Sequence, residues 1–183
     1  MDSFGNEMTK EELIQFGLQY LEGVGISSIC KVCISNGGSC CMHCIDLDDG
    51  IGCQQRNTSC TAWLCGYLKF ILYEAGLLEE WEQFWNQVPG QSFRMDYTPS
   101  IVSIKNEIQI PEIQSLGQAF AKDLARLSKK QNIIELNDKL DRYTTRFSIY
   151  KNLEILEKSR IELKQLTWGF YSFQYALRDY RNR

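Results

Sequence analysis

The spacing of apolar residues predicts a chain built mainly of helices. In the last fifty residues, apolar side chains recur at alternating steps of four and three residues in two successive stretches. This spacing places one apolar stripe along each helix, as in a helical bundle. Because neither Pro nor Gly separates the stretches, one long helix and two helices with a short link are both open. The stripes are Leu136, Leu140, Tyr143, Phe147 and Tyr150, then Leu163, Leu166, Phe170, Phe173, Leu177 and Tyr180.

Helix-start signals predict two further helices in the first half of the chain. Thr9 and Glu12 have the spacing of a capping box, which predicts a helix over residues 9–23. The Asn-Thr-Ser sequence at residues 57–59 predicts the start of a second helix, over residues 60–76.

The middle of the chain gives weaker signals. An aromatic-rich helix is expected over residues 77–88, and Pro111 is expected as the first residue of a helix over residues 111–130. Between these helices, residues 91–110 contain two β-branched runs on either side of Lys-Asn-Glu. They fit a small hairpin or, as the favoured alternative, an extended excursion.

These patterns predict an all-α fold: a helical bundle with an irregular cysteine-rich segment near the N-terminus. A chain of 183 residues buries enough apolar surface to fold as one domain. We therefore expect a single domain over residues 1–183, with a cysteine-cluster metal-binding segment at residues 25–65 and a long-helix bundle region at residues 111–183.

All eight cysteines and the only histidine fall within residues 30–65. The helical periodicity disappears between Cys30 and Ser59, so this segment has little apolar core of its own. The N-terminus has no apolar leader, and no run of about 18 or more apolar residues occurs, which predicts a cytoplasmic protein without a membrane span. Thiols stay reduced there and serve as metal ligands more often than as disulfides. Structural disulfides and free thiols are the alternatives.

The cysteine spacing predicts ligands without identifying the metal. Both C-x2-C units, the first expected on a tight turn, are familiar chelating units. The other gaps fit neither a zinc-finger class nor the bacterial ferredoxin run, so an iron–sulfur cluster and zinc both stay open. Adjacent cysteines and irregular gaps are easier to place around a large cluster than around one small ion, which favours the cluster. The predicted ligands are Cys30, Cys33, Cys40, Cys41, Cys44, Cys53 and Cys60.

Cys60, Cys65 and His43 have different expected roles in the segment. Cys60 is expected in the first turn of its helix, where free N–H groups and the helix dipole favour a thiolate. Cys65 follows five residues later, about 140° further around the helix at ~100° per residue, so it is expected to face elsewhere as a small buried hydrophobe. His43 is within reach of the site as a ligand or as a neighbour of ligands. As the only histidine, it excludes a catalytic zinc centre with several histidines.

The stretch GGSCCMHCIDLDDGIGCQQRNTSC at residues 37–60 resembles the zinc- or iron-chelating cysteine-cluster family (YkgJ-like), and the match extends over roughly residues 30–65. On this resemblance, Cys40 and Cys41 match the family's CC pair, Cys44 and Cys53 match its middle pair, and Cys60 matches the cysteine that follows its arginine. Arg56 matches that arginine, whereas Asn57 stands where the family usually has proline. The resemblance implies a zinc or iron–sulfur centre and no particular activity.

Charge is divided unevenly along the chain. Residues 1–121 carry six Lys or Arg against fifteen Asp or Glu, and residues 122–183 carry fourteen against eight. Such asymmetry can mark a nucleic-acid-binding tail. The basic residues are interleaved with acids, however, as on a solvated helix face. Nucleic-acid binding is therefore not expected, and association with a partner protein or between the two halves is favoured over it.

Two functions follow from these observations. The first is a protein that holds a [4Fe–4S] cluster with four of the predicted cysteines, in a redox, sensing or cluster-dependent accessory role, with Arg56 as a cofactor-binding residue that tunes the charge. The alternative is a helical binding or regulatory module in which zinc is structural and the helices contact a protein or nucleic-acid partner. The sequence contains no phosphate-binding loop and no HExxH motif, so we assign no catalytic residue.

Overall fold

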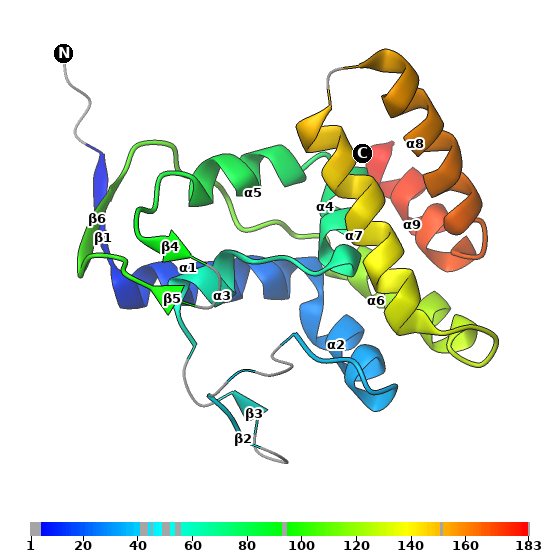
Figure 1. The fold of residues 1–183 in the computed structure, drawn as a ribbon, viewed down its shortest axis with the longest axis horizontal. Helices are drawn as coiled ribbons and strands as arrows, with labels where there is room; N and C mark the ends of the chain where they lie inside the picture. Colours follow the sequence, from blue (N-terminus) through cyan, green and yellow to red (C-terminus); the bar gives the residue numbers. More distant parts are fainter. Residues whose placement is uncertain are drawn as a thin grey trace.

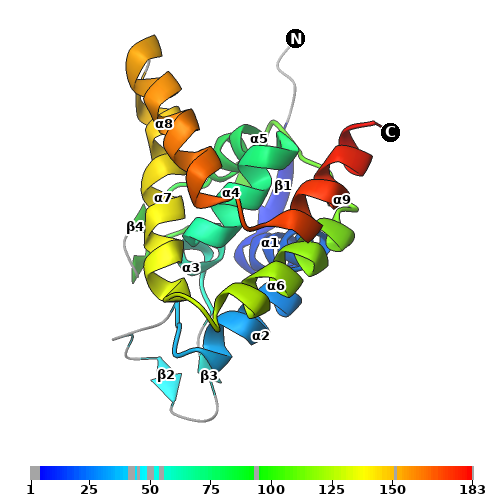
Figure 2. The ribbon, with the colours of Figure 1, turned by 90° about the vertical axis from the view of Figure 1, so that its right-hand side faces the viewer.

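The computed structural model describes residues 5–40, 44, 46–48, 52–53, 56–92, 95–150 and 152–182. Helices dominate this described part of the chain, which confirms the predicted all-α class (Figures 1 and 2). The helices are α1 Lys10–Val24, α2 Ile26–Ser35, α3 Thr58–Ala62, α4 Gly66–Ala75, α5 Leu78–Trp85, α6 Gln114–Leu127, α7 Ile133–Ile149, α8 Leu153–Leu166 and α9 Tyr171–Arg181.

Short strands form three antiparallel pairs: β1 Asn6–Thr9 with β6 Ile101–Ile104, β2 Leu47–Asp48 with β3 Gly52–Cys53, and β4 Gln91–Ser92 with β5 Met95–Asp96. The hairpin that we considered between the two β-branched runs on either side of Lys-Asn-Glu does not form, because the first run, β6, pairs with β1 and the second run forms no strand. Gln87 accounts for the turn after β6, because its Oε1 accepts hydrogen bonds from the backbone N–H groups of Lys105 and Asn106 at 2.8 and 2.9 Å.

Helix α1 begins as predicted. The Thr9 side chain accepts a hydrogen bond from the Glu12 N–H at 3.2 Å, and the Glu12 carboxylate accepts one from the Thr9 N–H at 2.7 Å, which completes the capping box. The helix ends at Gly25, whose φ of 91° starts α2 in a new direction. A Cβ at Gly117 would lie 2.1 Å from the Val24 carbonyl oxygen, so α1 and α2 meet α6 with backbones in close contact.

The C-terminal region forms three helices, α7, α8 and α9, rather than the one or two that the apolar pattern allowed. Asn152 starts α8, because its side chain accepts hydrogen bonds from the N–H groups of Glu154 and Ile155. A turn around Gly169 separates α8 from α9. The predicted apolar stripes do face the core, except that Tyr150 is 45% exposed.

Two helix boundaries differ from the sequence prediction. The helix expected over residues 60–76 is divided into α3 and α4, because Trp63 takes an extended conformation. Helix α6 begins three residues after Pro111. The residues before it contact the end of α1 instead: the Ile113 N–H donates a hydrogen bond to the Gly23 carbonyl at 3.0 Å.

An aromatic cluster at the centre of the core holds α4, α6 and α9 together. Phe120 of α6 is fully buried and stacks on Phe170, with a ring-centroid distance of 4.6 Å and an interplanar angle of 6°. Phe173 and Tyr67 meet the same ring edge-on, at 5.5 and 5.6 Å. Among the described residues, no helix has both the length and the apolar character needed to cross a membrane.

Asp96 joins the start of α3 to the β4–β5 pair. Its carboxylate accepts hydrogen bonds from the N–H groups of Thr98 and Thr58, each at 2.9 Å, and lies 3.1 Å from the Lys10 ammonium. Burial acts to raise the pKa of Asp96, but the hydrogen bonds from Thr98 and Thr58 outweigh it and hold this pKa well below its usual value.

Asp96 is expected to make the fold acid-sensitive. A carboxyl whose pKa is lowered by folding stabilises the folded state above its unfolded pKa of about 3.9, and this stabilisation is lost as the pH falls toward the folded value. Urea unfolding of the wild type should therefore show falling stability below about pH 4, and Asp96→Asn should flatten that dependence. If stability fell equally steeply with pH in the variant, Asp96 would not be the source of the acid sensitivity. Glu135→Gln, which removes one carboxylate of an exposed ion pair, is the control.

Candidate metal centre

Helix α2 carries the first two cysteines of the predicted site. Cys30 and Cys33 lie within α2, one turn apart on the same side of the helix. The expectation that this C-x2-C unit forms a tight turn, within a segment without periodicity, is therefore wrong. Helix formation continues to Ser35 because the apolar face of α2 packs on the core through Ile29, which is 1% exposed.

A Schellman motif at the end of α2 turns the chain back toward Cys33. Gly37 has a φ of 83°, and its N–H donates to the Ile34 carbonyl at 3.0 Å, while the Gly38 N–H donates to the Cys33 carbonyl at 3.0 Å. Gly38 is buried so closely against Cys33 that a Cβ there would lie 2.3 Å from the Cys33 sulfur. This close return places Cys40 near the thiols of α2.

The fourth cysteine comes from the start of α4. Cys65 is the N-cap of α4, and the next residue, Gly66, is in contact with the backbone of α7. The Tyr67 N–H donates to Asn137 Oδ1 at 3.2 Å, and the Tyr67 hydroxyl donates to the Ile133 carbonyl. These contacts fix the first turn of α4 on α7 and thereby fix the position of Cys65.

Four thiols and one guanidinium interact with one another: Cys30, Cys33, Cys40, Cys65 and Arg56. We call them the thiol cluster. A hydrogen bond from the Cys65 thiol, with help from the Arg56 charge, lowers the pKa of Cys40 to about 7, although burial acts in the other direction. The lowered pKa favours the thiolate of Cys40, the form that binds metals, and Cys40 is exposed to solvent.

The other three thiols have raised pKa values. Burial, and to a smaller extent Cys40 and Cys33, raise the pKa of Cys30 to about 11, while Arg56 acts to lower it. Burial and the Cys40 charge raise the pKa of Cys33. The hydrogen bond that Cys65 donates to Cys40, and then burial, raise the pKa of Cys65. Without a metal, the cluster thus has one acidic thiol among three protonated ones.

The structure brings together only part of the predicted ligand set. Cys30, Cys33, Cys40 and Arg56 belong to the thiol cluster. Cys44 lies 3.9 Å from the Asp46 carboxylate, and Cys53 is exposed on β3, in the hairpin that projects from the helical body beyond α3 (Figure 1). Cys60 is half-buried in the first turn of α3, as predicted, and its N–H donates to the Asn57 side chain at 2.8 Å. Cys41 and His43 lie outside the described residues.

Cys65 was expected to be a small buried hydrophobe, and it does pack, partly buried, against the core. Its interaction with Cys40 was not expected, because the prediction assumed one helix through Cys60 and Cys65, and the chain breaks at Trp63. The available signal was Gly66, since glycine inside a helix costs about 1 kcal/mol relative to alanine and marks a boundary or a close backbone contact.

The thiol cluster is not a closed metal site in this conformation. Within the described part of the chain, no three Cys, His, Asp or Glu side chains converge closely enough to hold a metal ion. The thiols interact electrostatically across the space between α2 and the start of α4. Metal binding therefore requires the sulfurs to turn toward a common point, which couples binding to local folding.

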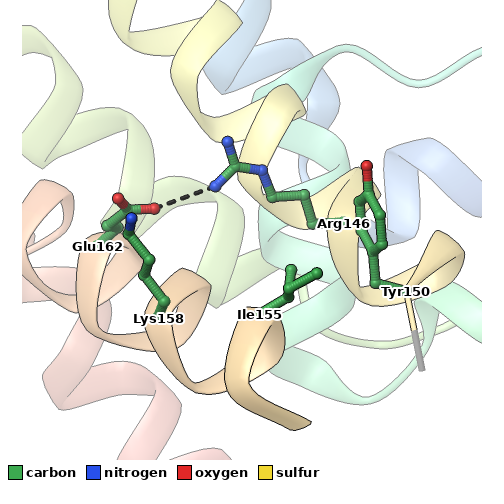
Figure 3. Close-up of a pocket in the computed structure, with 5 residues that line it drawn as sticks. All are labelled: Arg146, Tyr150, Ile155, Lys158 and Glu162. Carbon is green, nitrogen blue, oxygen red and sulfur yellow. Dashed lines mark hydrogen bonds and ion pairs between the residues drawn. The ribbon is translucent and has the colours of Figure 1, made fainter. Parts of the chain in front are cut away.

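A concave feature lies between α7 and α8, and none of the described cysteines lines it. It is a cavity of about 300 Å³ lined by Arg146, Tyr150, Ile155, Lys158 and Glu162 (Figure 3). Arg146 is already paired with Glu162 at 3.1 Å. Because its guanidinium charge is balanced within the protein, we assign no function to this cavity.

Comparisons of the chain with protein-family models, with curated proteins and with solved structures found no match. The resemblance of residues 30–65 to the cysteine-cluster family therefore stays a prediction, and the functional argument depends on the thiol cluster.

Proposed function

We propose that the chain is a metal-binding protein whose centre is held by Cys30, Cys33, Cys40 and Cys65. The observation that carries this proposal is that these four thiols, from three separate segments, lie close enough for their charges to interact, with Arg56 acting on Cys30 and Cys40. Four cysteines are the usual ligand number for a [4Fe–4S] cluster and for structural zinc. Cys65 replaces Cys44, Cys53 and Cys60 of the sequence-based set.

An iron–sulfur cluster in a redox, sensing or cluster-dependent accessory role is the first candidate. The position of Arg56 supports it, since this guanidinium acts on both Cys30 and Cys40. A bound cluster exchanges single electrons, and its reduction potential depends on nearby charge and on exposure to solvent. Arg56 would favour the more negatively charged, reduced form and so raise the potential.

Structural zinc is the second candidate, and the contact between Cys40 and Cys65 supports it. Each of these two thiols is the largest influence on the pKa of the other. In a tetrahedral site with Zn–S bonds of about 2.3 Å, neighbouring sulfurs lie about 3.8 Å apart. Zinc would then tie α2 and the following loop to α4, and function would depend on the helical surface.

The test is anaerobic purification of the full chain followed by assays for iron, sulfide and zinc. A coloured protein with about four irons and equal sulfide per chain identifies the cluster, and a colourless protein with about one zinc identifies the structural site. An anaerobic protein that contains neither metal contradicts the proposal.

Two matched variants test the ligand set. Cys65→Ser is expected to lose most of the metal, because it removes a proposed ligand at the fixed start of α4. Cys53→Ser is expected to keep it, because Cys53 lies on the β2–β3 hairpin and does not belong to the thiol cluster. The reverse pattern would restore the sequence-based ligand set and contradict the role of Cys65. Circular dichroism of both variants checks that each remains folded.

A further inference from the structure

Helix α9 and the turn before it expose three large aromatic side chains. Trp168 is 73% exposed, Tyr171 57% and Tyr175 67%. Tyr171 and Tyr175 are four residues apart on α9 and therefore lie on the same side of the helix. Trp168 lies in the turn that leads into α9, three residues before Tyr171. The opposite side of α9 is occupied, since Phe173 and Leu177 are buried in the core.

Cationic side chains lie close to two of these aromatic rings. The Arg126 guanidinium of α6 lies 5.3 Å from the centre of the Tyr171 ring, and the Arg178 guanidinium of α9 lies 5.4 Å from that of Tyr175. Lys122 is exposed one turn before Arg126 on α6. We call the surface formed by Lys122, Arg126, Trp168, Tyr171, Tyr175 and Arg178 the α6–α9 face.

Helices α6 and α9 pack side by side and run in opposite directions, so residues from both helices contribute to this face (Figure 2). Near one end, the Arg126 guanidinium donates to the Gly169 carbonyl, and the buried Asp123 accepts the Phe173 N–H at 2.9 Å. Asp123 also pairs with Arg126 at 3.3 Å. These contacts fix Arg126 over the Tyr171 ring and keep the Asp123 charge away from solvent.

Three of the acids that balanced the basic C-terminal region in the sequence lie on another helix. Glu154, Glu157 and Glu162 belong to α8, which is not part of the α6–α9 face. Glu112 and Asp179 border the face, since they line a cavity together with Tyr175. The fold thus keeps the α8 acids away from the face and leaves acids at its Tyr175 end.

We propose that the α6–α9 face binds single-stranded nucleic acid. Exposed aromatic rings stack with bases of any sequence, and Arg and Lys neutralise the phosphates of the same strand. An acidic peptide would use the cations but would gain little from the flat rings. The exposed rings beside cationic side chains favour a nucleic-acid strand over an acidic peptide. This differs from the expectation drawn from the order of charges along the chain.

The test is fluorescence anisotropy of a short fluorescein-labelled oligothymidine titrated with the full chain. Binding is expected at low salt, and the logarithm of the affinity should fall linearly with the logarithm of the salt concentration. Tyr175→Ala should weaken binding by at least about fivefold, as expected for the loss of one stacked base, with an unchanged salt slope. Arg178→Ala should reduce the slope by about 0.7, as expected for the loss of one phosphate contact.

Controls separate stacking from general attraction to anions. Tyr97→Ala removes a 71% exposed tyrosine beside β5, far from α9, and should bind as the wild type does. Absence of binding at low salt would overturn the proposal. Wild-type affinity in Tyr175→Ala, with equal competition by heparin, would also overturn it, because the face would then attract any polyanion, including an acidic protein. The measurement does not depend on the metal and so is independent of the thiol cluster.

Discussion

Gly66→Ala is expected to destabilise the protein by about 3 kcal/mol or more. A Cβ at residue 66 would lie 2.0 Å from the Asn137 carbonyl oxygen and 2.6 Å from the Asp141 nitrogen. Both atoms belong to the backbone of α7, so no side chain can move aside. Helices α4 and α7 would have to separate, which would break the contacts that Tyr67 makes with Asn137 and Ile133. Urea unfolding followed by circular dichroism measures the loss.

Gly169→Ala is the matched control for this prediction. The nearest atoms to a Cβ there belong to the flexible side chain of Leu127, at 3.1 Å and beyond, so only a small change is expected. If the two variants were equally stable, α4 and α7 would not be in backbone contact. Cys65 directly precedes Gly66, so we also expect the Gly66 variant to retain less metal than the Gly169 variant.

Local signals in the sequence predicted those helices whose limits depend on nearby residues. The capping box of Thr9 and Glu12 is an interaction between residues three apart, and α1 begins where it predicts. The apolar stripes of the C-terminal region also face the core as expected. Periodicity left open a break between the two stripes, which the structure has at Asn152, the N-cap of α8. It did not show the break around Gly169, which divides the second stripe between α8 and α9.

Features that depend on distant residues were not predictable in the same way. Strand β6 pairs with β1, which is more than ninety positions earlier in the chain, and neither strand contains a signal for its partner. The late start of α6 has the same kind of cause, since Ile113 bonds to Gly23 instead of joining a first helical turn. Tertiary contacts of this kind override local propensity.

The candidate site likewise contains features that local sequence signals predict and features that depend on distant residues. Density and spacing predicted that Cys30, Cys33 and Cys40 would act together, and Gly37 and Gly38 provide the return that their spacing requires. The inclusion of Cys65 depends on packing between α4 and α7, which no cysteine motif encodes. The identity of the metal depends on sulfur positions that the metal itself would adjust, so it has to be measured.

Phe120→Ala is expected to cost about 3–5 kcal/mol of unfolding free energy, the range for truncating a fully buried aromatic side chain. Phe120 is completely buried and contacts Phe170, Phe173 and Tyr67, so its removal leaves a cavity where α4, α6 and α9 meet. The surrounding rings belong to α4 and to the start of α9, and they cannot close the space without moving these helices. Urea unfolding at neutral pH measures the change.

Phe147→Ala is the comparison for this core prediction. Phe147 is half-buried and stacks on Tyr73 at 4.6 Å near the edge of the core, so its loss should cost clearly less. Equal costs would mean that the Phe120 cluster is not the centre of the fold. The position of Phe120 also predicts how α9 behaves: because Phe120 connects α9 to α4, the exposed face of α9 should lose its order together with the core. Oligothymidine binding by the Phe120 variant should then fall over the same urea range as its helical circular dichroism signal, whereas loss of binding before unfolding would show that α9 detaches first.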